Sequence, residues 1–207
     1  MSEVHMQTER ELKLQLTHAQ WVTLREDLGT SDSIIRQTNT YFDTPDRELR
    51  TTASMMVRIR EAAGEYELTA KDRIAGETTG LLETRERTQP LDAAVAQRIL
   101  QGEISLTTLD LPLCRALATE VGGDLLPIGA VQNTREVYRL LDGYIAEVDR
   151  TDFLGQRVDY EVEIELRKSE HSYDGARAML AINTSLDCSS LAPSRSKYGR
   201  FLELNAV

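Results

Sequence analysis

Two segments of the chain, Glu9-Arg10-Glu11-Leu12-Lys13 and Glu161-Val162-Glu163-Ile164-Glu165, place charged side chains at every second position. In a β-strand, alternate side chains point to the same face of the sheet. Each segment therefore predicts a strand with one charged face and one apolar face. Like charges about 7 Å apart repel by roughly 2 kcal/mol at an effective dielectric of about 20. A row of glutamates must therefore face water or cations, and hard divalent metal ions prefer carboxylate oxygens.

The overall composition excludes several classes of protein. A content of 41% hydrophobic and 28% charged residues is typical of a soluble globular protein. The net charge of −10 argues against a general nucleic-acid binder. No apolar run is long enough to span a membrane, and the first residues do not resemble a secretory signal. Cys114 and Cys188 stand alone, which indicates a reducing compartment. We therefore expect a cytoplasmic protein.

The pattern of apolar residues predicts an α+β protein with about eight strands. The expected strands cover residues 7–16, 33–43, 54–62, 65–73, 79–88, 126–141, 143–152 and 156–167. Helices are expected from Thr17 to Gly29, from Pro90 onward, over 113–121 and over 171–184. The chain shows no internal repeat and no low-complexity linker. We therefore expect a single domain, residues 1–207, with a helical insertion at about 90–123.

Most of these strands carry charges of both signs on one face. The residues that share such a face are Arg58 with Arg60, Glu67 with Lys71, Glu83 with Arg85 and Arg87, Arg135 with Arg139, and Glu147 with Asp149. Closing the sheet into a barrel with this face inward would give a polar tunnel. Its cations would hold a highly charged anion, and its carboxylates would hold the metals that bridge to it. A triphosphate, with about four negative charges, fits this mixture.

Two plainer interpretations compete with a ligand-binding tunnel. An open antiparallel sheet could expose its polar face to water. Alternatively, the charges could line a barrel that binds nothing, although many buried charges without counter-ions would be costly.

The order of the charged motifs resembles that of the CYTH superfamily, the triphosphate tunnel metalloenzymes. Glu9-x-Glu11-x-Lys13 is similar to the family's N-terminal signature, and Tyr41-Phe42-Asp43-Thr44 is similar to its turn. The further similarities are Arg58-Ile59-Arg60, Leu68-Thr69-Ala70-Lys71, Glu83 with Arg85, Arg135, Glu147-Val148-Asp149, Glu161-x-Glu163-x-Glu165 and Ser196-Lys197-Tyr198. Gly80-Leu81-Leu82-Glu83-Thr84 also resembles a bacterial subgroup described as YjbK-like or adenylate-cyclase-like.

This resemblance implies an eight-stranded antiparallel closed β-barrel that binds a triphosphate with Mg²⁺ or Mn²⁺. The metal ligands it implies are Glu9, Glu11, Asp149, Glu161, Glu163 and Glu165. The side chains it implies for the phosphoryl oxygens are Arg58, Arg60, Lys71, Arg85, Arg135 and Lys197. Glu9, Glu11 and Lys13 are the expected catalytic residues, with Lys13 polarising a phosphate or the attacking water.

The expected function is metal-dependent hydrolysis of inorganic tripolyphosphate or of a small organic triphosphate. One alternative is a class IV-type adenylate cyclase, which converts ATP to cyclic AMP and pyrophosphate. Another is a non-catalytic sensor of nucleotide or polyphosphate. Thiamine triphosphate is disfavoured, because its head group would benefit from an aromatic shelf and Trp21, the single Trp, is expected in the core. The expected partner is thus a small molecule and not a nucleic acid or a membrane, and a homodimer is an alternative to a monomer.

Overall fold

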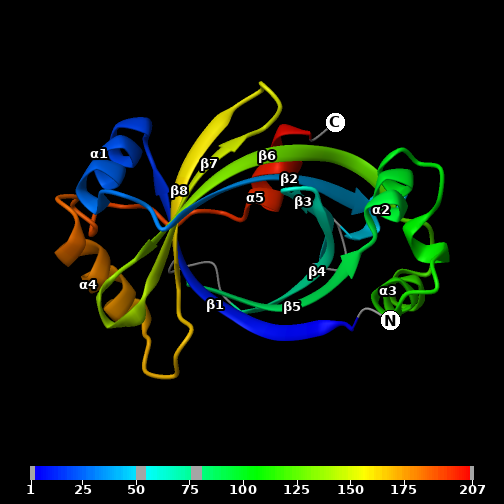
Figure 1. Cartoon of the computed structure of the whole chain (residues 1–207), viewed down its shortest axis with the longest axis horizontal. Coiled ribbons are helices and arrows are strands. Elements are labelled where there is room, and N and C mark those ends of the chain that lie inside the picture. The colour runs from blue at the N-terminus through cyan, green and yellow to red at the C-terminus, as the bar shows by residue number, and fades with distance from the viewer. Residues whose placement is uncertain (1–2, 50–54, 76–80, 206–207) are drawn as a thin grey trace. The chain divides into compact units, whose positions relative to one another are not determined.

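The structure is a computed structural model that describes residues 3–49, 55–75 and 81–205. Within these ranges, eight antiparallel strands form a closed barrel in the order β1-β5-β4-β3-β2-β6-β7-β8 (Figure 1). The strands are β1 (His5–Leu16), β2 (Ser33–Asp43), β3 (Met55–Ala62), β4 (Glu65–Ala75), β5 (Leu81–Leu91), β6 (Leu126–Arg139), β7 (Ile145–Asp152) and β8 (Val158–Glu165). This confirms the predicted fold class. Residues 54, 79 and 80, which the sequence placed in strands, lie outside the described residues.

Five α-helices and two short 3₁₀ turns accompany the described strands. They are α1 (His18–Leu28), α2 (Ala93–Leu100), η2 (Leu106–Thr108), α3 (Pro112–Val121), η3 (Leu141–Gly143), α4 (Tyr173–Asn183) and α5 (Lys197–Leu204). In the part of the chain that the structure describes, every helix is too short or too polar to cross a membrane.

Helix α2 begins at Ala93 and not at Pro90, which is the penultimate residue of β5. Asp92 is the N-cap, because its side chain accepts hydrogen bonds from the N–H groups of Ala94 and Val95 at 3.0 and 3.2 Å. Proline has no N–H to donate, so a strand tolerates it only where no ladder hydrogen bond needs that donor. The expectation that Pro90 opens the helix was wrong, since a nearby carboxylate caps it better.

Helix α5 was not predicted. Ser196 caps it by accepting a hydrogen bond from the Gly199 N–H at 3.1 Å. The helix has only 8 residues, and its buried side includes the cations Lys197 and Arg200 beside Phe201. Hydrophobic periodicity, the main sequence signal for a helix, is weak when buried positions are charged.

The contacts within the chain define two compact units, each with its own apolar core. Unit 1 comprises the described residues of 1–8, 37–73 and 85–131, and unit 2 those of 9–36, 74–84 and 132–207. The single domain with an insertion at 90–123 stays a prediction, although α2, η2 and α3 do fall in that stretch.

In unit 1, the apolar row of strands β3 and β4 packs against α2 and α3. Val57 and Ile59 of β3 and Leu68 of β4 belong to a buried cluster that also contains Ile99 of α2 and Leu117 of α3. These strand residues alternate with polar ones, so one face of each strand binds the helices and the other is left for charged side chains.

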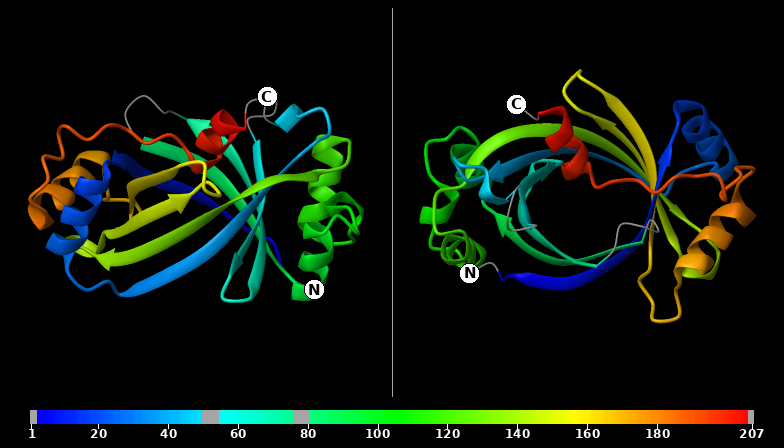
Figure 2. Two further views of the ribbon diagram at one scale, coloured as in Figure 1. Left: turned by 90° about the horizontal axis from the view of Figure 1, so that it is seen from above. Right: turned by 180° about the vertical axis from the view of Figure 1, so that it is seen from behind.

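In unit 2, the apolar rows of β1, β7 and β8 pack against α1 and α4. Leu12 and Val162 share a buried cluster with Leu24 of α1 and Leu180 of α4. Figure 2 shows these two helices side by side. Because the helices cover the apolar face, the charged face of the same strands is turned away from them.

The turn after β2 depends on the buried Asp43 of the Tyr-Phe-Asp-Thr motif. Its Oδ1 accepts hydrogen bonds from the N–H of Thr44 at 2.7 Å and from that of Leu49 at 2.9 Å. Buried N–H groups must be paired, so this carboxylate organises the backbone where the strand ends.

Replacing Asp43 with Ala leaves two N–H groups without this acceptor. We expect the free energy of unfolding to fall by about 2–4 kcal/mol. Asp46→Ala, at an exposed position of the same turn, should change it by less than about 0.5 kcal/mol. Urea unfolding followed by circular dichroism measures both, and equal losses in the two variants would contradict the assigned role of Asp43.

Candidate active site

The strand register of unit 2 places the charged residues of three strands on one face. Lys13 of β1 lies opposite Glu163 of β8, which lies opposite Glu147 of β7. In the next row, Glu161 lies opposite Asp149. Directly opposed residues of antiparallel strands point to the same side. The charged segments at the two ends of the sequence are therefore neighbours in the sheet.

This charged face is buried, which excludes the solvated open sheet. Relative exposure is 0% for Asp149 and Glu161 and 3% for Glu11 and Glu163. The apolar residues of the same strands are buried on the opposite face. Both faces are therefore shielded from water, and the carboxylates depend on cations for compensation.

Asp149, Glu161 and Glu163 form the tightest group of carboxylates among the described residues. One oxygen from each lies within 4.8 Å of the others. We call these three residues the acidic cluster. The Lys197 ammonium at the start of α5 lies 2.7 Å from Asp149 Oδ2 and 2.6 Å from Glu163 Oε1, and it also pairs with Glu161.

Arg135 of β6 is the second cation at the acidic cluster. Its Nη2 lies 2.7 Å from Asp149 Oδ2 and 2.6 Å from Glu163 Oε2, and its Nη1 pairs with Glu147. Burial alone would raise the pKa of Asp149, but Arg135 and Lys197 outweigh it and lower that pKa to about 2. The pKa of Glu163 likewise lies well below its usual value, because Lys13, Lys197 and Arg135 outweigh its burial.

Lys13 is the third cation. Its Nζ lies 2.8 Å from Glu11 Oε1 and 2.9 Å from Glu163 Oε1. Burial would lower the pKa of Lys13, but attraction to Glu11, Glu163 and Glu161 outweighs it and raises that pKa well above its usual value. Lys13 therefore remains an ammonium and joins the expected catalytic Glu11 to the acidic cluster.

The acidic cluster fits a divalent cation. Carboxylate oxygens are the ligands that Mg²⁺ and Mn²⁺ prefer, and three of them converge here. Glu161 Oε1 is buried, pairs with the Lys197 ammonium and accepts no hydrogen bond of normal geometry. Glu161 Oε1 is thus compensated by the Lys197 ammonium, whose place a divalent cation could take.

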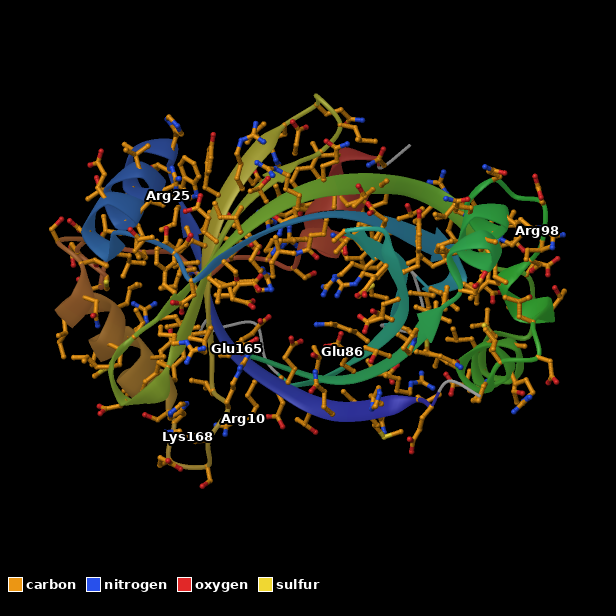
Figure 3. All side chains as sticks on the ribbon, viewed as in Figure 1. Arg10, Arg25, Glu86, Arg98, Glu165 and Lys168 are labelled. Carbon is orange, nitrogen blue, oxygen red and sulfur yellow. The ribbon has the colours of Figure 1, made fainter. Side chains whose placement is uncertain are left out.

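Three predicted metal ligands, Glu9, Glu11 and Glu165, do not lie in the acidic cluster. Glu9 Oε2 accepts a hydrogen bond from Thr84 Oγ1 at 3.3 Å. Glu165, labelled in Figure 3, pairs with Arg167 beyond the end of β8. Among the described residues, the oxygens of Asp149, Glu161 and Glu163 lie close together, and those of Glu9, Glu11 and Glu165 are not part of this group.

Unit 1 contains a separate group of charges on β3, β4 and β5. Glu86 Oε2 lies 3.2 Å from Lys71 Nζ, and Glu86 Oε1 lies 3.9 Å from Arg58 Nη2. Arg58 is buried, and its Nε and Nη2 have no hydrogen-bond partner. The buried Thr69 hydroxyl, directly across from Arg58, has none either. Unpaired buried donors of this kind favour an anionic ligand.

Of the other predicted phosphate ligands, Arg60 donates from Nε to Asn39 Oδ1 at 3.3 Å.

Arg85 is not brought together with Arg58 and Lys71. Its side chain is 55% exposed, and its Nε lies 3.5 Å from Asp72. Glu86, the next residue, is buried and points to the other face of β5 (Figure 3). Alternation along the sequence placed Glu83, Arg85 and Arg87 on one charged face and favoured Arg85 as a phosphate ligand, but Arg87 pairs with Glu120 on α3. A shift of one residue in a strand exchanges its two faces.

Two further residues of the site were missed. Glu86 was assigned to the wrong face of its strand. Arg200 was overlooked because α5 was not predicted, yet its Nη2 lies 2.5 Å from Glu161 Oε2. Its spacing of three residues from Lys197, one helical turn, was the available signal.

Glu147 differs from its neighbours in its protonation. Burial is the main reason that the pKa of Glu147 rises to about 7; Arg135 opposes this rise, and Glu163, Glu165 and Asp149 add to it. Between about pH 4.5 and pH 7, the folded protein therefore binds more protons at Glu147 than the unfolded chain does. This contribution to stability is present at low pH and is lost as the pH rises through 7.

Replacing Glu147 with Gln should remove that pH dependence. From pH 4.5 to 7.5, we expect the wild type to lose on the order of 2 kcal/mol of unfolding free energy relative to the variant. Urea unfolding in EDTA at several pH values measures the difference. Glu103→Gln, at an exposed position, should follow the wild type, and parallel curves for all three proteins would contradict the prediction.

Comparisons with known proteins agree with the observed barrel fold. Residues 7–193 match the CYTH domain. HpAC1 from Hippeastrum, a proposed adenylyl cyclase with a dominant triphosphatase activity, aligns with a TM-score of 0.80 at 24% identity over 94% of this chain and 95% of its own. A proposed adenylate cyclase from Bacillus halodurans aligns with a TM-score of 0.77 at 24% identity over 95% and 98%.

A third structure, the PH1012 protein of Pyrococcus horikoshii, aligns with a TM-score of 0.58 at 19% identity over 95% of this chain and 98% of its own. A search among curated proteins finds no match. The similarity to these structures supports the fold, and the match to the CYTH domain covers nearly the whole chain. The chain belongs to the CYTH domain family.

Proposed function

We propose that the protein is a divalent-metal-dependent triphosphatase that hydrolyses inorganic tripolyphosphate or a small organic triphosphate. The observation that carries this proposal is the buried acidic cluster, in which three carboxylates converge within 4.8 Å between Lys13, Arg135 and Lys197. Such a site suits a cation that is itself shared with an anionic substrate. The triphosphatase activity described for HpAC1 is consistent with it.

Asp149, Glu161 and Glu163 would hold Mg²⁺ or Mn²⁺, and Glu11 is the next candidate because Lys13 joins it to Glu163. When bound, the ion would neutralise phosphoryl oxygens and favour the ionised form of an attacking water. Lys13, held as an ammonium, would polarise a phosphoryl oxygen. Glu9 and Glu165 would not bind the metal directly, because their oxygens are not part of the acidic cluster.

Lys197 would have two roles. Its ammonium now lies among the same three carboxylates that would bind the metal. A divalent ion and an ammonium repel each other at such distances. We therefore expect the metal to displace Lys197, which would then be free to bind a phosphoryl oxygen. Arg135, whose donors reach Asp149, Glu163 and Glu147, would instead remain as a fixed counter-charge.

Arg58, Arg60 and Lys71 of unit 1 would bind phosphoryl oxygens. The unpaired donors of Arg58 and Thr69 support this assignment most directly. Glu86 would hold Arg58 and Lys71 on the same side of the sheet in the free protein. Arg85 receives no phosphate role, because its side chain is largely exposed and pairs with Asp72.

The second candidate function is the adenylate cyclase reaction, which the description of the Bacillus halodurans relative favours. Incubation with Mg²⁺ or Mn²⁺ and, separately, tripolyphosphate, ATP or thiamine triphosphate distinguishes the candidates by their products. Orthophosphate together with pyrophosphate from tripolyphosphate supports the triphosphatase. Cyclic AMP and pyrophosphate from ATP support the cyclase. Tight triphosphate binding without any product would indicate a sensor.

Replacing Glu163 with Gln removes one cluster ligand and one partner of Lys13, Arg135 and Lys197. We expect kcat for tripolyphosphate to fall by at least about 100-fold at saturating Mg²⁺. Glu170→Gln, at an exposed position of the same unit, should retain the wild-type rate. A Glu163→Gln variant that folds and keeps a near-normal kcat would overturn the metal assignment.

Replacing Arg58 with Met should affect substrate binding and leave metal binding unchanged. The loss of one charge-assisted contact predicts a rise in KM for tripolyphosphate of about 10- to 100-fold. Arg98→Met, on the exposed side of α2 (Figure 3), is the matched control. Steady-state kinetics and Mn²⁺ titration measure the two quantities, and an unchanged KM would remove Arg58 from the phosphate site.

A further inference from the structure

The two oxygens of the Glu161 carboxylate have different surroundings. Oε2 accepts hydrogen bonds from Ser194 Oγ at 2.7 Å and from Arg200 Nη2 at 2.5 Å. Oε1 accepts no hydrogen bond of normal geometry and pairs with the Lys197 ammonium. Since Oε2 is satisfied, Oε1 is the oxygen that Glu161 presents to Asp149 and Glu163.

Both donors to Oε2 are themselves fixed. Arg200 is 4% exposed, and its Nη1 lies 3.0 Å from Asp159 Oδ2 and 3.4 Å from Gln15 Oε1. The Ser194 N–H donates to the Lys13 carbonyl oxygen at 3.0 Å, which ties its backbone to β1. The segment before α5 and the first turn of α5 therefore hold the two donors against β1 and β8.

We propose that Arg200 and Ser194 are positioning residues that orient Glu161, so that Oε1 rather than Oε2 is available as the metal ligand. Partners of this kind, one shell outside the ligands, commonly contribute 10- to 100-fold to metal affinity. This inference rests on the proposed function, because it assumes a metal at the acidic cluster. The inference goes beyond the proposed function, because it assigns the C-terminal segment a role in forming the metal site.

Arg200 suits this role better than a lysine would. Its guanidinium donates to Glu161 from Nη2 while Nη1 donates to Asp159. This planar fork fixes the direction of both carboxylates at once, whereas an ammonium is a single point of charge. The Glu161 carboxylate is therefore restrained in rotation as well as in position.

The test is a titration with Mn²⁺ in the absence of any phosphate substrate, with free Mn²⁺ measured by electron paramagnetic resonance. We expect Arg200→Leu to raise the Kd for Mn²⁺ by 10- to 100-fold. Arg195→Leu removes the same charge from an exposed position nearby and should stay within about twofold of the wild type. Hydrogen exchange of the α5 amides in the same samples reports whether that helix stays in place.

Variants of Ser194 distinguish an orienting role from simple anchoring of α5. Ser194→Ala removes one donor to Glu161 Oε2 and leaves Arg200 and Lys197 intact. We therefore expect a higher Kd for Mn²⁺ and unchanged hydrogen exchange of the α5 amides. Ser194→Thr keeps the hydroxyl and should restore the wild-type Kd.

Four outcomes have distinct meanings. Weaker binding in both Arg200→Leu and Ser194→Ala, with α5 protected in Ser194→Ala, supports the inference. Wild-type affinity in both variants overturns it. Weaker binding confined to Arg200→Leu, with loss of α5 protection, also overturns it in favour of an anchor. A wild type that does not bind Mn²⁺ overturns the proposed metal site itself.

Discussion

The charged face of unit 2 depends on the balance between buried carboxylates and buried cations. Glu11 and the acidic cluster supply the negative charges, joined by Glu147 as the pH rises through its pKa of about 7. Lys13, Arg135, Lys197 and Arg200 supply the positive ones. Each of these four cations contacts at least two carboxylates. Removing one partner of a buried pair typically costs about 3–5 kcal/mol, because the other charge is left uncompensated. The strands can therefore keep this face buried only while the network is complete.

The same constraint explains how the chain is organised around the network. Side chains alternate along β1, β7 and β8, so the apolar residues pack against α1 and α4 and the charged residues lie on the opposite face. The strands alone leave an excess of carboxylates, and the C-terminal segment supplies the balance. It pairs with β1 through Leu14 and Pro193 and then brings Lys197 and Arg200 to the acidic cluster. α5 is thus held by these charges as well as by the buried Phe201.

The sequence predicted those parts of the fold and site that follow from alternation within one strand. Glu161 and Glu163 were recognised because a period of two leaves few interpretations. The face of β5 was predicted wrongly, since charged residues occupy both of its rows and only packing of Arg87 against Glu120 on α3 decides between them. Arg200 was missed because its partners Asp159 and Glu161 come from a strand far away in the sequence, and its spacing from Lys197 was a weak local signal.

The position of Lys197 connects the structure of the acidic cluster with the proposed reaction. Its ammonium satisfies three carboxylates that would otherwise repel one another, so it stabilises the site before any metal arrives. If the same oxygens held a divalent ion, that ion would supply their counter-charge, and Lys197 would be available to bind a phosphoryl oxygen. Arg200 cannot make this exchange, because Asp159 and Glu161 hold its guanidinium from two sides. One turn of α5 would therefore combine a cation that moves on metal binding with a cation that stays fixed.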